Sequence, residues 1–306
     1  MHRHFLVLNG INGSNPLGFL ATIGTLSVAS RFRKNARLSW NVIEGAWRPL
    51  LWNCYADQTS FLEELFSEIE KASMDVFRLE KKFPYESHQF LTHLRNFFDA
   101  ATFNDHRSVN FLAAFGSEIL TNKGKKDLFA STDFCMVRSG DSAGQGLLSY
   151  ANAINEDFKK DKECLNRALF ETWDYKDEGY SLRWDPSEDQ RYALRWDDPS
   201  PAKKKTMLGA NRLALEALPL FPSVPVEGKL RTTGFNKTKD REVYFTWPIW
   251  SCELSLYSVR SLLSLAELYK EKPDRIKLEQ MGIQEVFRCQ RISTRYYKNF
   301  LPAAPI

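Results

Sequence analysis

The sequence is poor in cysteine, glycine and proline, and it lacks a long uninterrupted apolar run. Its five cysteines, Cys54, Cys135, Cys164, Cys252 and Cys289, form no C-x-x-C pair. An odd number without paired spacing argues against a disulfide framework or a zinc ribbon and favours a reducing, cytoplasmic compartment. With 15 glycines and 13 prolines among 306 residues, collagen-like and linker-like chains are excluded.

Formal charge is absent from residues 5–30, a feature of signal sequences and membrane spans. Turn-forming residues over 9–16 interrupt this stretch, so it holds neither an apolar span of about 18 residues nor an h-region. We therefore expect a soluble protein with no membrane partner.

Charge is unevenly distributed along the chain. The whole sequence has 42 Lys+Arg against 38 Asp+Glu, and 43% of its residues are hydrophobic, which excludes an intrinsically disordered chain. From residue 201 onward there are 18 Lys+Arg and 10 Asp+Glu. This surplus favours a polyanionic partner, although a solvated surface explains it equally simply.

The first 73 residues carry clear signals for secondary structure. Asn15 and Pro16 predict the start of a helix over 16–31, which follows a strand near residues 5–9. Strands over 37–42 and 47–52 flank a Glu44-Gly45 turn, and a helix over 58–73 comes next. This β-α-β-β-α order resembles the opening of a ferredoxin-like unit.

The rest of the chain alternates between helical and strand-like patterns. The expected helices are 87–101, 107–120, 147–156, 160–171, 208–218 and 256–269. The expected strands are 134–137, 229–235, 242–247 and 285–293, with a hairpin over 180–197. We predict a mixed α+β fold, with a ferredoxin-like N-terminal unit, helical insertions and a β-hairpin-containing C-terminal half. Residues 1–306 are expected to form a single body, with 120–130 as the candidate sub-boundary.

A G-x-S-x-G motif at residues 140–144 places Ser142 between a strand-like run and a helix, as in a nucleophile elbow. All five histidines precede Ser142, so the Ser, acid, His order of an α/β-hydrolase cannot be assembled. The chain is also too helical for a chymotrypsin-like body. We expect no enzyme and no catalytic residues, and we keep a Ser142 hydrolase as the less favoured alternative.

Two further motifs carry residue types that can bind ligands. The glycines at 140–146 can present backbone N–H groups to a phosphate, but no Walker lysine accompanies them and a plain turn is favoured. Carboxylates cluster around a repeated Leu-Arg-Trp-Asp phrase: Asp185, Glu188, Asp189, Asp197 and Asp198. The spacing of these carboxylates matches no EF-hand loop. His88 and His93 are five residues apart on an expected helix, so they do not form the i, i+4 pair of a helical metal site. We expect no metal and no cofactor, with metal binding at this acidic hairpin left open.

The C-terminal third combines basic, amide and aromatic side chains. Arginine and lysine neutralise phosphates, tyrosines stack on unpaired bases, and amides read base edges. The candidate nucleic-acid-binding residues are Lys203, Lys204, Lys205, Asn211, Arg212, Arg231, Arg288, Gln290, Arg291, Arg295, Tyr296, Tyr297 and Lys298. A strand over 284–293 places Arg288 and Gln290 on one face and Arg291 on the other. Arginines whose stems cover a plain core remain the structural alternative.

Several phrases of the sequence together resemble one family. They are Leu8-Asn9-Gly10, residues 15–26 (NPLGFLATIGTL), residues 182–186 (LRWDP) with 191–195 (RYALR), 209–214 (GANRLA), 230–235 (LRTTGF) and 246–250 (TWPIW). The chain resembles the accessory and large-subunit-like proteins of type I-G (formerly I-U) CRISPR–Cas systems. The N-terminal phrase is shared most broadly within that group, and the phrases over 181–250 are similar to a smaller subfamily.

The resemblance implies a subunit of an RNA-guided, Cascade-like surveillance complex in antiviral defense. Such a subunit contacts crRNA or target DNA, for example near the protospacer-adjacent motif, and has no nuclease chemistry of its own. Its partners are then crRNA, target DNA or both, together with other CRISPR effector subunits. A protein–protein scaffold subunit is the alternative.

Overall fold

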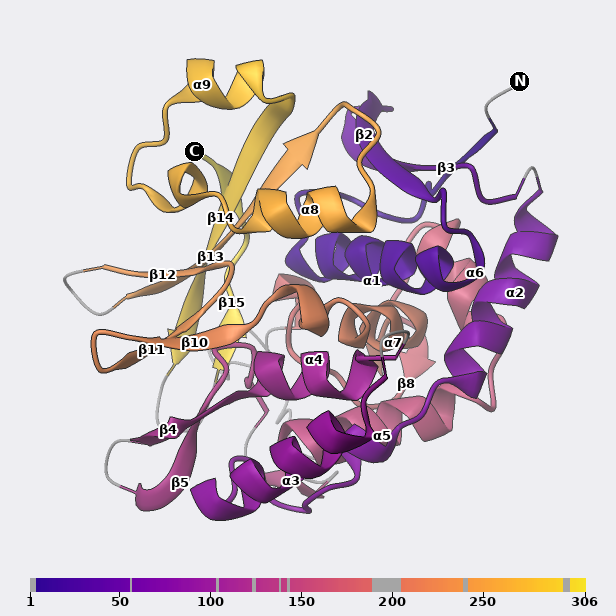
Figure 1. Ribbon diagram of the computed structural model, residues 1–306. Coiled ribbons are helices and arrows are strands. Elements are labelled where there is room, and N and C mark those ends of the chain that lie inside the picture. The colour runs from indigo at the N-terminus through magenta and orange to yellow at the C-terminus, as the bar shows by residue number, and fades with distance from the viewer. Residues whose placement is uncertain are drawn as a thin grey trace, which may run out of the picture.

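The computed structural model describes residues 4–55, 57–102, 105–122, 125–137, 139–141, 144–188, 205–238, 242–293 and 298–306. These residues form a mixed α+β protein of helices and small antiparallel sheets, which confirms the predicted fold class. Figure 1 shows helices through the centre and lower right of the molecule, with the longest strands on the left. No helix within the described ranges has the length and apolar character needed to cross a membrane.

The N-terminal unit has the predicted element order. It consists of β1 (Phe5–Val7), α1 (Pro16–Phe32), β2 (Arg37–Ile43), β3 (Ala46–Trp52) and α2 (Gln58–Lys71). The strands are antiparallel in the order β1-β3-β2, the arrangement of a split β-α-β. Among the described residues no other strand joins β1, so the sheet has three strands rather than the four of a complete ferredoxin-like unit.

Helix α1 is the centre of the core. Its N-cap is Asn15, whose Oδ1 accepts hydrogen bonds from the backbone N–H groups of Leu17 and Gly18 at 2.8 and 3.2 Å. Helix α7 (Leu208–Leu215) packs so closely on α1 that a β-carbon at Gly24 would lie 1.8 Å from the carbonyl oxygen of Leu213. Helix α8 (Leu256–Leu263) lies on another side of α1 (Figure 1). Because α1 is surrounded, it is apolar nearly all round.

The middle of the chain adds short helices and two-stranded ribbons. They are η1 (Asp75–Phe77), α3 (Ser87–Ala100), α4 (Arg107–Phe115), β4 (Gly116–Asn122), β5 (Lys125–Ser131), β6 (Ser139–Asp141), β7 (Gly144–Gln145), α5 (Leu147–Phe158), α6 (Cys164–Leu169), β8 (Asp177–Glu178), η2 (Pro186–Glu188) and β9 (Lys205–Thr206). The strand pairs are β4–β5, β6–β7 and β8–β9.

Three predicted elements in this region were wrong. The helix expected over 107–120 ends at Phe115, and β4 begins at Gly116, where a β-carbon would lie 2.1 Å from the carbonyl oxygen of Ala130. Residues 134–137 are buried but form no strand. The first arm of the hairpin expected over 180–197 is also irregular, because Trp184 is buried and donates its Nε1–H to the carbonyl of Phe134 at 3.0 Å. Its second arm lies outside the described residues.

The C-terminal half contains the largest sheet. Its elements are η4 (Leu218–Leu220), β10 (Ser223–Val226), β11 (Lys229–Thr232), β12 (Phe235–Lys237), β13 (Val243–Trp250), η5 (Ala266–Tyr269), α9 (Arg275–Gln280), β14 (Ile283–Ser293), β15 (Lys298–Phe300) and β16 (Ala304–Pro305). The sheet has the order β12-β13-β14-β15, with β16 also on β14, and β10 pairs with β11. The main hydrophobic cluster extends from Leu6 to Phe300 and so includes residues from both sides of 120–130.

Candidate anion-binding site

Part of the predicted nucleic-acid-binding set lies outside the described residues. Lys203, Lys204, Arg295, Tyr296 and Tyr297 are in this group. So are Ser142 of the G-x-S-x-G motif and Asp189, Asp197 and Asp198 of the acidic hairpin. Asp185 and Glu188, the described members of that hairpin, are buried. No group of three potential metal ligands occurs within the part of the chain that the structure describes.

Asn211 and Arg212 lie on α7 with no exposed surface. The Asn211 amide accepts a hydrogen bond from the Leu182 backbone N–H at 2.9 Å and donates to Thr206 Oγ1 at 3.0 Å. Arg212 donates through Nε to Asn155 Oδ1 at 3.0 Å. In this position neither side chain is accessible to a ligand at the surface.

Lys205 and Arg231 are exposed, but they lie on different elements. Lys205 is in β9, next to β8, whereas Arg231 is in β11 of the separate β10–β11 hairpin. The side chain of Arg231 is 63% exposed and lies 3.8 Å from the carboxylate of Glu227. An exposed pair of this kind contributes little to stability and leaves the guanidinium available to solvent.

The candidates on the last long strand divide between its two faces, as the strand pattern predicted. Arg288 donates to Thr246 Oγ1 at 3.0 Å and to the carbonyl of Lys270 at 2.7 Å, so it ties η5 to the sheet. Burial lowers the pKa of Arg288. Gln290 donates to a carboxylate oxygen of Glu242 at 3.1 Å.

On the other face of β14, Arg291 and Lys298 point to the same atom. Both donate to the carbonyl oxygen of Cys135, at 3.4 and 3.3 Å. Within the described residues the buried Nε of Arg291 has no hydrogen-bond partner. The structure therefore brings two of the predicted cations together here and places the other described candidates elsewhere.

A more strongly basic site, which the sequence reasoning missed, lies at the C-terminal end of α1. A pocket of about 830 Å³ opens between α1, α4 and α8. Its lining includes four cationic side chains, Arg31, Lys34, Arg107 and Arg260, against one carboxylate, that of Asp105. Tyr257, whose side chain is 80% exposed, also lines it.

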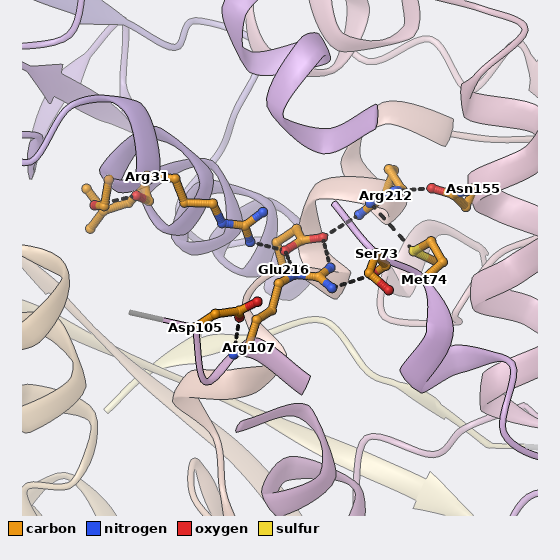
Figure 2. Close-up of polar contacts among 10 residues, drawn as sticks. Arg31, Ser73, Met74, Asp105, Arg107, Asn155, Arg212 and Glu216 are labelled. Carbon is orange, nitrogen blue, oxygen red and sulfur yellow. Dashed lines mark hydrogen bonds and ion pairs between the residues drawn. The ribbon is translucent and has the colours of Figure 1, made fainter. Parts of the chain in front are cut away.

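Next to this pocket, one buried carboxylate pairs with three guanidinium groups, two of which, those of Arg31 and Arg107, also line the pocket (Figure 2). Glu216 has no exposed surface and pairs with Arg31 from α1, Arg107 from α4 and Arg212 from α7. The Arg107 Nη2 and Arg212 Nη1 atoms lie 2.7 and 2.9 Å from Glu216 Oε1. Burial alone raises the pKa of Glu216, but the three guanidiniums outweigh it and hold that pKa well below its usual range.

The three arginines differ in how many guanidinium N–H donors their contacts within the protein leave available to a ligand. Arg212 is enclosed, while Arg107 gives its remaining donor, Nη1, to the carbonyl of Ser73 and stacks over the Phe111 ring at 4.7 Å. Arg31 is 27% exposed and gives only Nη2 to Glu216 among the described residues. Arg31 lines the pocket, and its Nε and Nη1 groups are the donors that its contact with Glu216 leaves unused.

Three positive charges around one negative charge leave this cluster with a net positive charge, and Lys34 and Arg260 add to it. Arg260 donates to the carbonyl of Pro219 at 3.3 Å, which keeps it at the pocket wall. Cations also favour a helix C-terminus for structural reasons alone, because they offset the helix dipole. A fixed, concave, cationic site of this size is suited to phosphate or another anion.

The signal for this site was present in the sequence. Residues 31–37 read RFRKNAR, four cations in seven residues with no acidic residue. The run lies within residues 1–200, whose net charge is negative, so the net charge of that part of the chain does not reveal this local cluster of cations. Arg107, Arg260 and Glu216 join it only through tertiary packing.

Comparison of the sequence with protein-family models found no match, and a search of curated proteins found none. The phrases that carry the resemblance to CRISPR–Cas proteins lie mostly in the core. Gly24 and Gly209 are at close backbone contacts, and Trp184, Trp247 and Trp250 are fully buried. In this chain these residues serve packing, and the basic pocket lies next to the first of these phrases, at the C-terminal end of α1.

Proposed function

We propose that this protein is a non-catalytic nucleic-acid-binding subunit of an RNA-guided, Cascade-like CRISPR surveillance complex, where it contacts crRNA or target DNA. The observation that supports the proposal best is the pocket in which the buried carboxylate of Glu216 fixes Arg31 and Arg107 beside Lys34 and Arg260. Phosphate contacts dominate the affinity of nucleic-acid-binding proteins, and arginines fixed in advance bind phosphate at a low cost in entropy.

The aromatic side chain at the pocket favours nucleic acid over a small inorganic anion. Tyr257 is exposed beside the cations, in position to stack on an unpaired base. The association with crRNA and other CRISPR subunits depends on the sequence resemblance.

Binding of labelled single-stranded RNA, single-stranded DNA and duplex DNA, measured by fluorescence anisotropy over a range of salt concentrations, tests the proposal. Lys34→Ala and Arg260→Ala are suitable variants because both side chains lie at the surface of the pocket. Each lost phosphate contact is expected to reduce the salt slope by about 0.7 for a single strand or about 0.9 for a duplex.

Lys176→Ala is the matched control, since this lysine is 78% exposed and does not line the pocket. The control should bind like the wild type. A wild type that ignores all three nucleic acids but co-purifies with a protein partner would refute the proposal in favour of a scaffold. Salt slopes unchanged by both pocket variants would remove the pocket from the binding site.

A further inference from the structure

A second basic pocket lies at the same end of helix α1. It has a volume of about 590 Å³ and is lined by Arg33, Lys34 and Arg37, with Glu253 as its one carboxylate. The amides of Asn35 and Asn53 also line it. Cations therefore outnumber carboxylates here too, and the amides add donors and acceptors for a sugar or a base edge.

The walls of this second pocket are held by local contacts. The guanidinium of Arg33 stacks over the Tyr55 ring at 4.5 Å, and Arg37 donates to the carbonyl of Ala36 at 3.0 Å. Asn53 donates from Nδ2 to the carbonyl of Asn35 at 3.2 Å, which links the segment after α1 to the end of β3. Arg33 and Arg37 are thus positioned before any ligand arrives.

The two pockets have one lining residue in common. Lys34 lines both, and the segment that contributes Glu253 to one contributes Ser255 and Tyr257 to the other. A polyanion that occupies one pocket and continues past Lys34 therefore enters the next. Together the two pockets are lined by the four cations of residues 31–37 and by Arg107 and Arg260.

We infer that the two pockets form one track, which binds successive phosphates of a single nucleic-acid strand as it passes the C-terminal end of α1. The inference rests on the proposed function and makes it more specific. Recessed pockets of this size accommodate phosphates of a flexible strand whose bases can turn outward, whereas a duplex presents its phosphates on a stiff convex surface. Tyr257 at one pocket and the paired asparagines at the other offer places for the displaced bases.

Competition between probes of different length tests the track. We would measure the affinity of the full-length protein for 5′-phosphorylated RNA and DNA of 2, 4, 8 and 12 nucleotides, and for a 12-base-pair duplex. The variants are Arg260→Ala in the first pocket, Arg33→Ala and Arg37→Ala in the second, and Lys34→Ala at the lining residue common to both. Lys176→Ala again serves as the surface control.

For the 12-nucleotide strand, each of the four variants should weaken binding about tenfold, the expected effect of losing one charge-assisted contact. The penalty of Arg33→Ala and Arg37→Ala should vanish for the shortest probe, which occupies only the more cationic first pocket, while that of Arg260→Ala should remain. A preference for RNA over DNA of the same length would indicate contacts to the 2′-hydroxyl groups.

Three outcomes separate the track from the proposed function. If Arg33→Ala and Arg37→Ala bind the 12-nucleotide strand like the wild type while Arg260→Ala is weakened, the track is refuted and the proposed function stands. If the duplex binds as tightly as the single strand, the single-strand assignment is refuted. If the wild type binds none of the probes, the proposed function itself is refuted.

Discussion

Glu216→Gln is the most informative perturbation of the cluster next to the first pocket. The amide has the shape of the carboxylate but no negative charge, so three guanidiniums would face one another without a counter-ion. Arg212 is fully buried and cannot turn to water, whereas Arg31 and Arg107 keep 27% and 16% exposure. Removing one partner of a buried ion pair costs about 3–5 kcal/mol, and because two of these arginines can still reach solvent, we expect a loss of about 3 kcal/mol.

The free energy of unfolding by urea and the melting temperature measure this effect. A loss of about 3 kcal/mol corresponds to a fall in Tm of roughly 5 °C in a chain of this size. Glu227→Gln is the matched control, because Glu227 is 84% exposed and its ion pair with Arg231 spans 3.8 Å. We expect the control to change stability by less than about 1 kcal/mol.

The pH dependence has a defined sign. The pKa of Glu216 in the folded protein lies well below its ordinary value of 4.5, so its carboxylate contributes stability that is fully present above about pH 5. That contribution is lost as the pH falls below 4.5 towards the folded pKa. The gap in stability between the wild type and Glu216→Gln should therefore be widest near neutral pH and narrow in acid. A Glu216→Gln variant as stable as the Glu227→Gln control at pH 7 would refute the view that this carboxylate holds the arginines together.

Two further predictions test the packing of the core and the environment of the thiols. Gly24→Ala should lower the free energy of unfolding in urea by about 1–3 kcal/mol, because the added β-carbon would lie 1.8 Å from the Leu213 carbonyl oxygen. Gly179→Ala is the control and should be tolerated, since the nearest atom to its added β-carbon lies at 3.8 Å. Equal stability of the two variants would contradict the close packing of α1 on α7. Burial raises the pKa of Cys54 to about 12 and also raises the pKa values of Cys135, Cys164 and Cys289. Because the thiolate is the reactive form, a thiol reagent at pH 8 should label only the exposed Cys252 in the native protein. After unfolding, it should label all five cysteines. Rapid labelling of a second cysteine in the native state would contradict the second prediction.

Local chemistry made the N-terminal unit predictable. Asn15 before Pro16 and the Glu44-Gly45 turn act within a few residues, so the bounds of α1, β2 and β3 came out within one or two residues of the prediction. Prediction failed where burial decided the backbone. Residues 134–137 read as a strand because they are apolar, yet they pack as an irregular segment into the core.

The predicted binding residues show the same limit. Arg212 and Asn211 have the side chains of a nucleic-acid contact, but in the fold they satisfy buried polar groups on α5, α7 and the segments around them. Nothing in a list of residues distinguishes an arginine that neutralises an internal carboxylate from one that faces solvent. For Arg212, the one hint in the sequence is Glu216, four residues further along the same helical stretch.

By itself the sequence determined the mixed α+β class, the start of α1 and the order of the first strands, because capping, turn residues and apolar periodicity act over distances of a few residues along the chain. Tertiary structure alone decided which cations share a surface. Arg31, Arg107 and Arg260 are far apart in sequence, and they line one pocket only because tertiary packing brings α1, α4 and α8 together, where Glu216 pairs with Arg31 and Arg107.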